Sequence, residues 1–164
     1  MIRRYFVLIV AVLFVVAALP FTDGQDHAVD RGAEERAIEN VLHSVFGWAV
    51  TKDFDRFYGA IADDEDFISV TPYDRVKFGI RAVKESAAFW ASPDFTAISH
   101  DIRDLRIRFS RGGDVAWFYC VVDDYNTWQG KPANWENVRW TGVLEKRNDA
   151  WRVVQQHFSW PRAQ

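Results

Sequence analysis

The stretch Val138–Trp160, VRWTGVLEKRNDAWRVVQQHFSW, decides the fold of this chain. Both of its arms are rich in Val, Thr and aromatic residues, which pack well on a half-buried pleated surface. The two residues between the arms, Asn148 and Asp149, tolerate the backbone of a tight hairpin turn. We therefore expect two antiparallel strands that are joined at these two residues.

A two-residue turn also fixes which side chains face each other across the hairpin. It pairs Glu145 with Arg152, an opposite-charge cross-strand pair of the kind that stabilises a sheet. On the other face it places Trp140 opposite His157. That face is then mainly apolar and aromatic with a single histidine in it, and we expect a pocket there.

The N-terminus has the layout of a secretory signal peptide. Two arginines precede an uninterrupted apolar run over residues 5–19, and small residues precede Gln25. The run is shorter than the roughly 20 residues of a membrane span. Residues 1–24 are therefore expected to be a signal peptide, with an uncleaved membrane anchor as the alternative. The mature protein is expected to be secreted or periplasmic and not bound to the membrane.

Charge and cysteine content exclude several classes of function. The formal net charge is −3, which gives no electrostatic reason to bind nucleic acid. Cys120 is the single cysteine, so the sequence predicts no disulfide framework. The four histidines are scattered and show no metal-ligand spacing. We expect no metal, no cofactor and no nucleic-acid partner.

The rest of the chain predicts helices followed by long strands. Apolar residues at three- and four-residue spacing indicate helices over 33–49, 53–61 and 79–90. Strands are expected over 67–71, 76–78, 95–109 and 115–123, with a polar loop over 124–134 before the hairpin. The prediction is one α+β domain over 33–160, with helices on one face of a curved antiparallel sheet. A lead-in over 25–32 precedes it, and a tail over 161–164 follows it.

This order of elements resembles the nuclear transport factor 2-like superfamily. Within it, Arg139-Trp140-Thr141, followed by Trp151-Arg152-Val153-Val154 and His157-Phe158-Ser159, is similar to the last hairpin of SnoaL-like domains. The resemblance implies a cone, in which a curved antiparallel sheet wraps around a long N-terminal helix, with two further helices and a pocket at the open end. The superfamily includes ketosteroid isomerase, scytalone dehydratase, polyketide cyclases and members that only bind or assemble.

The resemblance carries over few functional residues. The isomerase has its carboxylate base just before a proline on the first strand, and that position here is Thr71, before Pro72. The dehydratase depends on a His–Asp pair, in which His157 matches the histidine and no residue matches the partner. These departures favour a binding or assembly role over catalysis. An acid–base isomerase, dehydratase or cyclase that uses His157 and a carboxylate is the alternative.

Two candidate catalytic residues follow from residue chemistry. His157 is one, because an imidazole ordinarily titrates near neutral pH; a core histidine bonded to a neighbour such as Ser159 is the alternative. Asp123 and Asp124 end a strand at the expected open rim, where a desolvated carboxylate has a raised pKa and can act as a base. The alternative is a pair of solvated strand-end charges. Asp123 is the candidate catalytic carboxylate.

The candidate binding residues share the face expected to carry His157. Alternation places Trp117, Tyr119 and Val121 on the face of Asp123, with Leu105 on the neighbouring strand and Trp140 on the hairpin. These five side chains either line a cavity or fill the core. We expect them to bind a small apolar or aromatic ligand.

The opposite face of the long strands is expected to form a homodimer. Val143, Val154 and Phe158 share that face in the predicted register. An exposed contiguous apolar area of this kind usually marks an interface.

Overall fold

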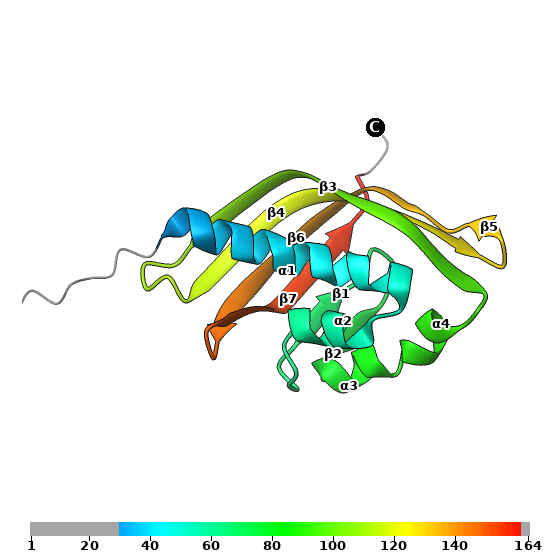
Figure 1. Cartoon of the computed structure of the whole chain (residues 1–164), viewed down its shortest axis with the longest axis horizontal. Coiled ribbons are helices and arrows are strands. Elements are labelled where there is room, and N and C mark those ends of the chain that lie inside the picture. Colours follow the sequence, from blue (N-terminus) through cyan, green and yellow to red (C-terminus); the bar gives the residue numbers. More distant parts are fainter. Residues whose placement is uncertain (1–29, 162–164) are drawn as a thin grey trace, which may run out of the picture.

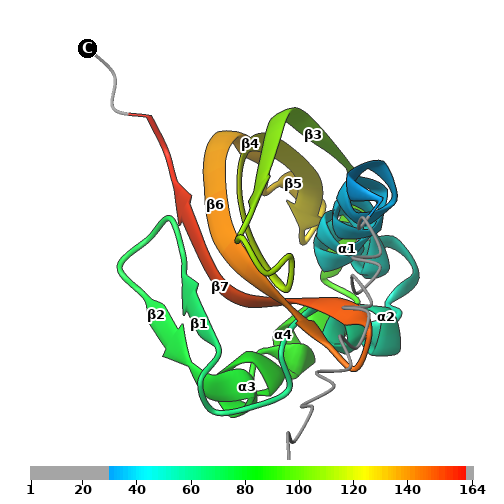
Figure 2. The ribbon, with the colours of Figure 1, turned by 90° about the vertical axis from the view of Figure 1, so that its left-hand side faces the viewer.

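The computed structural model describes residues 30–161, and a long helix crosses the inner face of a curved sheet (Figure 1). This helix is α1 (Arg31–Thr51), and the seven strands of the described residues form one sheet that curls around it (Figure 2). The predicted α+β class and cone-like arrangement are confirmed. The predicted signal peptide lies outside the described residues.

The helices begin where acidic residues cap them. The Asp30 carboxylate accepts from the Ala33 amide at 3.2 Å at the start of α1, and Asp53 accepts from the Arg56 amide at 3.0 Å at the start of α2 (Phe54–Ala60). The helix expected over 79–90 is two short helices, α3 (Gly79–Lys84) and α4 (Ala87–Ala91). They separate because the Ser86 amide donates to the carbonyl of Val83, which tightens the last turn of α3.

The strands follow the order β2-β1-β7-β6-β4-β3, and β5 pairs with β4. Their bounds are β1 (Ile68–Val70), β2 (Val76–Phe78), β3 (Phe95–Phe109), β4 (Val115–Trp128), β5 (Lys131–Pro132), β6 (Trp135–Arg147) and β7 (Ala150–Ser159). The sheet is mixed, because β1 and β7 pair in parallel while the other neighbouring strands are antiparallel. A parallel pair between strands so far apart in the sequence has no local signature.

The polar loop predicted over 124–134 is wrong. β4 continues to Trp128, and the chain turns at Gln129 and Gly130, which both have positive φ. Asp124 and Asn126 pair with β3 inside the continuous strand. The strand tolerates polar residues at these positions because their side chains line a pocket instead of filling the core.

The hairpin turn is where the sequence places it. Asn148 and Asp149 both have positive φ, 50° and 62°, and Glu145 pairs with Arg152 as predicted. Lys146 of this hairpin forms an ion pair with Glu34 of α1 at 2.6 Å. The turn end of the hairpin therefore fixes the start of α1 across the sheet.

Beyond Val153 the predicted register is wrong by one residue. Leu144 pairs with Val153, whereas Val143 pairs with Gln155, so Val154 is the extra residue of a β-bulge. A shift of one residue exchanges the two faces of a strand. Trp140 consequently pairs with Phe158, and His157 pairs with Thr141.

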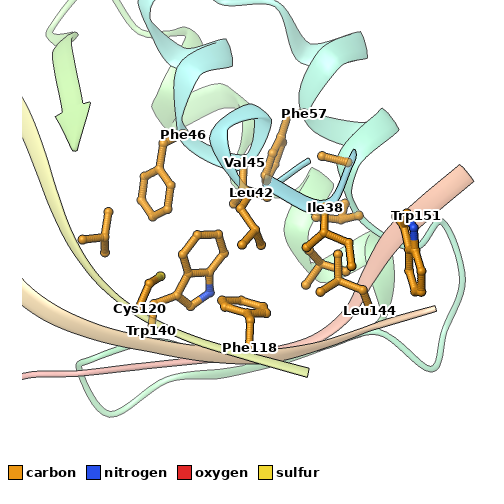
Figure 3. Close-up of a cluster of buried hydrophobic side chains, with 14 of the residues drawn as sticks. Ile38, Leu42, Val45, Phe46, Phe57, Phe118, Cys120, Trp140, Leu144 and Trp151 are labelled. Atoms are coloured by element: carbon orange, nitrogen blue, oxygen red, sulfur yellow. The ribbon is translucent and has the colours of Figure 1, made fainter. Parts of the chain in front are cut away.

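The core lies between α1 and the concave face of the sheet (Figure 3). Trp140 is completely buried at its centre, where the rings of Phe46 and Phe118 meet it edge-on with centroids 5.1 Å and 4.8 Å away. Gly142 gives room for this packing, because a Cβ there would lie 2.7 Å from the Phe118 ring and 2.5 Å from the carbonyl of Gln155.

Candidate functional site

A pocket of about 840 Å³ opens beside the core, at the end of the sheet where β4, β6 and β7 meet the helices. Its walls also include β1, the link from β1 to β2, and the region of α3 and α4. A cavity of this size lies within the range of small-molecule sites, roughly 300–1,000 Å³.

Aromatic side chains make up most of the apolar wall. One group packs between the helices, with Trp48 stacked on Phe57 at 4.9 Å and Trp90 edge-on to Trp48 at 5.5 Å. A second group lies on the sheet side, where Trp135 and Phe158 have ring centroids 5.3 Å apart. Together they offer two aromatic surfaces to one ligand.

The polar part of the pocket is small and buried. Asn126 is 4% exposed, and its Nδ2 donates to the Asp124 carboxylate at 2.7 Å and to the Asp124 carbonyl at 3.3 Å. Gln156 is 6% exposed, and its Nε2 donates to the Ser69 hydroxyl at 3.1 Å. These four residues come from β4, β7 and β1, so the sheet positions them.

Two amide oxygens in this polar part have no hydrogen-bond partner among the described residues: Oδ1 of Asn126 and Oε1 of Gln156. The orientation of Asn126 is fixed, because both groups at its Nδ2 belong to Asp124 and accept hydrogen bonds. Its Oδ1 is therefore an acceptor that remains free. An unpaired buried acceptor costs about 1–3 kcal/mol, which is recovered when a ligand or water donates to it.

Asp124 lies in the same pocket without a basic partner. Among residues 30–161, no Lys, Arg or His nitrogen forms an ion pair with its carboxylate. Burial raises the pKa of Asp124 to about 6, against the opposing effect of the hydrogen bond from Asn126. The group therefore titrates near neutral pH, in the range that suits proton transfer.

Lys77 is a second, half-buried charge of the pocket. Its ammonium donates to the Ser86 hydroxyl and lies 5.1 Å from the centre of the Trp90 ring. Burial lowers the pKa of Lys77, the nearby Arg75 lowers it further, and Glu85 opposes them. One pocket thus holds a carboxyl with a raised pKa and an amine with a lowered one.

The candidate catalytic residues from the sequence do not meet in this pocket. His157 is exposed on the outer face of β7, because the bulge at Val154 reverses its direction. Asp123 also lies on the outer face, where Arg103 donates to it at 2.6 Å and the Asn137 amide donates at 2.6 Å. Burial by itself raises the pKa of Asp123, but these two donors outweigh it and the pKa lies below its ordinary value.

The candidate binding residues are divided between surface and core. Trp117 and Tyr119 are 49% and 39% exposed on the outer face of β4, and Val121 shares that face, so the predicted inner row of β4 is wrong. Trp140 fills the core and Leu105 packs against it, and neither lines the pocket.

The sequence reading missed the polar group of the pocket because it ended β4 too early. The segment Asp124-Tyr125-Asn126-Thr127-Trp128 alternates in a strand-like way, and this signal could have extended the strand. Asp124, Asn126 and Trp128 then share one face, as the structure shows.

Within residues 30–161, no three His, Cys, Asp or Glu side chains converge to hold a metal ion. Cys120 is buried, and burial raises the pKa of its thiol to about 12. No helix in this part of the chain has the length and apolar character that crossing a bilayer requires.

The family model of the SnoaL-like domain matches residues 38–163. The chain belongs to the SnoaL-like domain family. No curated protein matches this SnoaL-like chain.

Solved structures share the nuclear transport factor 2-like (NTF2-like) fold of this SnoaL-like domain at low identity. One is a candidate calcium/calmodulin-dependent kinase II association domain from Exiguobacterium sibiricum, 10% identical, with a TM-score of 0.63 over 80% of this chain and 96% of that one. Another is a candidate scytalone dehydratase from Novosphingobium aromaticivorans, 13% identical, with a TM-score of 0.64 over 78% and 84%. A third is a candidate dehydratase of the NTF2-like family from Streptomyces avermitilis, 16% identical, with a TM-score of 0.64 over 81% and 99%.

Proposed function

We propose that this SnoaL-like domain binds a small, mainly apolar or aromatic molecule in the pocket between α1 and the ends of β4, β6 and β7. The observation that carries the proposal is the combination of aromatic walls with two buried amide oxygens that lack partners. Aromatic walls favour a flat apolar body, and a few fixed polar groups orient it. A ligand that donates to Asn126 recovers the cost of its unpaired oxygen.

The test compares thermal melts of the protein with a library of one- and two-ring compounds. Ligands are expected to raise the midpoint of the wild type and to lose at least about tenfold in affinity in Trp135→Ala, which removes part of the aromatic wall. Tyr125→Ala is the matched control, because Tyr125 is an exposed aromatic residue of the same sheet and does not line the pocket. A library without any stabilising compound, or equal losses in both variants, would contradict the proposal.

Acid–base chemistry is the second candidate, and one observation favours it. Asp124 has a raised pKa and Lys77 a lowered one in the same pocket, a pattern found where one enzyme needs both an acid and a base. The likeness to two candidate dehydratases supports an isomerase, dehydratase or cyclase reaction. In this proposal Asp124 acts as the catalytic base, and His157 and Asp123 take no part in the reaction.

The acid–base proposal predicts that turnover depends on pH, which the binding proposal does not. Turnover of a substrate should rise as Asp124 ionises around pH 6 and should be lost in both Asp124→Asn and Lys77→Met. If those variants bind the ligand but turn over as fast as the wild type, the acid–base proposal fails and the binding proposal stands.

We also propose a homodimer that forms through the outer face of the sheet. Two rows of paired residues cross the strands there: Phe78, Ile68, Gln155, Val143, Trp117 and Arg108 in one, and Val76, Val70, His157, Thr141, Tyr119 and Arg106 in the other. Phe78, Trp117 and Val76 are 67%, 49% and 47% exposed. Exposed apolar side chains gathered on one sheet face support an interface. Phe158, predicted for this interface, lies on the inner face instead.

Export is a further proposal and rests on the sequence of residues 1–24. In it, the SnoaL-like domain meets its ligand outside the cytoplasm.

A further inference from the structure

The sheet side of the pocket brings a carboxylate together with aromatic rings. Asp124 pairs across the sheet with Trp135, and both line the cavity. The Trp135 ring is 5.3 Å from that of Phe158 and 6.2 Å from that of Tyr73, which also line it. Ring faces attract cations, most strongly when water is excluded.

Among the described residues that line the pocket, the buried side-chain atoms that lack a partner are acceptors. Oδ1 of Asn126 is a fixed acceptor next to the Asp124 carboxylate. Two acceptor groups therefore lie side by side, the Asp124 carboxylate and Oδ1 of Asn126. A ligand group that donates several hydrogen bonds and carries positive charge complements both of them.

Among residues 30–161, no protein group already supplies that positive charge. His100 pairs with Asp124 on β3, but its Nε2 lies 2.9 Å from Nδ1 of His43 on α1 and forms no ion pair with Asp124. Arg56 of α2 lies near His100, and its Nε donates to the Ser44 hydroxyl at 3.2 Å.

The remaining charges of the pocket lie on other walls. Lys77 belongs to the wall of β2 and α4, where Ser86 and Trp90 hold it. Asp74, Arg75 and Glu85 are exposed, so solvent screens their charges.

We propose that the pocket recognises a protonated amine carried on an apolar or aromatic body, with the ammonium group at Asp124 and Asn126 and the body against Trp135 and Phe158. This inference rests on the proposed binding function and names the ligand class for the same pocket. The ammonium group completes an ion pair that the protein leaves open and donates to the free amide oxygen. Primary amines are the best fit because they offer three donors.

The experiment uses three probes of similar shape on the chain from residue 25 onward: 2-naphthylmethylamine, 2-naphthylmethanol and 2-naphthoate. Near neutral pH they are a cation, a neutral molecule and an anion. Calorimetric titration is expected to give the amine at least about tenfold higher affinity than the alcohol, and the carboxylate the lowest. Asp124→Asn should remove the preference for the amine, so that the amine and the alcohol bind with affinities within about twofold of each other.

Asp123→Asn is the matched control, because it removes the neighbouring carboxylate from the outer face and should leave the preference unchanged. A second measurement needs no variant: the affinity of the wild type for the amine should fall as the pH is lowered through about 6, while that for the alcohol stays constant.

The outcomes separate the two proposals. Binding of the alcohol or the carboxylate as tightly as the amine would overturn the inference and leave the binding function standing. A preference for the amine that survives Asp124→Asn would also overturn it. Failure of all three probes and of the compound library would overturn both proposals.

Discussion

Asp123 and Asp124 are neighbours in β4 whose carboxylates lie on opposite faces of the sheet. Asp123 receives hydrogen bonds from Arg103 and from the amide of Asn137, both at 2.6 Å. Asp124 faces the pocket, where Asn126 donates to it and no cation pairs with it among the described residues. Their pKa values consequently move in opposite directions, although the residues are adjacent and chemically identical.

Replacing Asp124 with Asn should stabilise the protein above neutral pH. The pKa of Asp124 is raised to about 6 in the folded state, so the folded protein binds a proton that the unfolded chain releases at lower pH. The stabilisation from this proton is complete below the unfolded value of 3.8 and is lost as pH rises through about 6. The Asn side chain is uncharged at every pH, so the variant avoids the cost of burying a carboxylate. Urea unfolding should show Asp124→Asn about 2–3 kcal/mol more stable than wild type near pH 8.

The same variant should lose its advantage near pH 4, where the wild-type carboxyl is protonated as well. An equal gain at both pH values would mean that the charge of Asp124 is not the cause. If the variant is more stable at high pH but binds ligand less tightly, the buried carboxylate lowers the stability of the protein in exchange for ligand binding.

Replacing Asp123 with Asn should have the opposite effect. The lowered pKa of Asp123 contributes stability that is present above its unfolded value and is lost as pH falls through its folded value. Asp123→Asn should lower the unfolding free energy near pH 7 by about 1–3 kcal/mol, at the lower end because Arg103 is 41% exposed. The difference from wild type should shrink below about pH 4 in the same urea experiment. A loss that persists in acid would indicate a packing effect.

The turn of the final hairpin could be predicted because its cause is local. Asn148 and Asp149 accept positive φ, and the residues beside them pair by proximity. The bulge at Val154 could not be predicted. The segment Val153-Val154-Gln155-Gln156 has two valines followed by two glutamines, and no Gly or Pro marks which residue is the extra one. One unseen residue moved His157 from the expected pocket to the surface.

The inner face of β4 was ambiguous for a different reason. Both rows of this strand are apolar, with Trp117 and Tyr119 in one and Phe118 and Cys120 in the other. Alternation identifies the buried row only when the other row is polar. The fold could be predicted because the order of helices and strands survives such errors, whereas the site depends on which way single side chains point.

Gly142 should not tolerate even one added methyl group. A Cβ at this position would lie 2.5 Å from the carbonyl of Gln155 and 2.7 Å from the Phe118 ring, so β6 or β7 would have to move. Gly142→Ala is expected to lower the unfolding free energy by about 1–3 kcal/mol. Gly59→Ala in α2 is the control, because its nearest neighbour would be 3.9 Å away and Ala favours a helix. Equal urea midpoints for the two variants would contradict the prediction that the close packing around Gly142 excludes a methyl group.

The protein is predicted to be exported and, after cleavage, to begin near Gln25. The two arginines, the apolar run and the small residues before position 25 predict cleavage there. Intact-mass measurement on protein from the extracytoplasmic fraction checks this expectation. Recovery of protein that retains Met1 on the membrane would favour the anchor instead.

The outer face of the sheet should hold two copies of the chain together. Trp117 is 49% exposed near the middle of that face, with Val143 beside it on β6 and Arg108 beside it on β3. A glutamate in place of Trp117 removes apolar contact area and places a charge where an interface excludes water, which opposes association. Light scattering at micromolar concentration is expected to give a dimer mass for wild type and a monomer mass for Trp117→Glu.

Val50→Glu is the matched control for the dimer experiment. Val50 is 52% exposed, comparable to Trp117, but lies on α1 and not on the sheet. The same charge there should leave the dimer mass unchanged. The circular dichroism spectra of both variants should match that of wild type, because neither residue is part of the buried core. A monomer mass for the wild type, or dissociation by both variants, would show that the outer face is not the dimer interface.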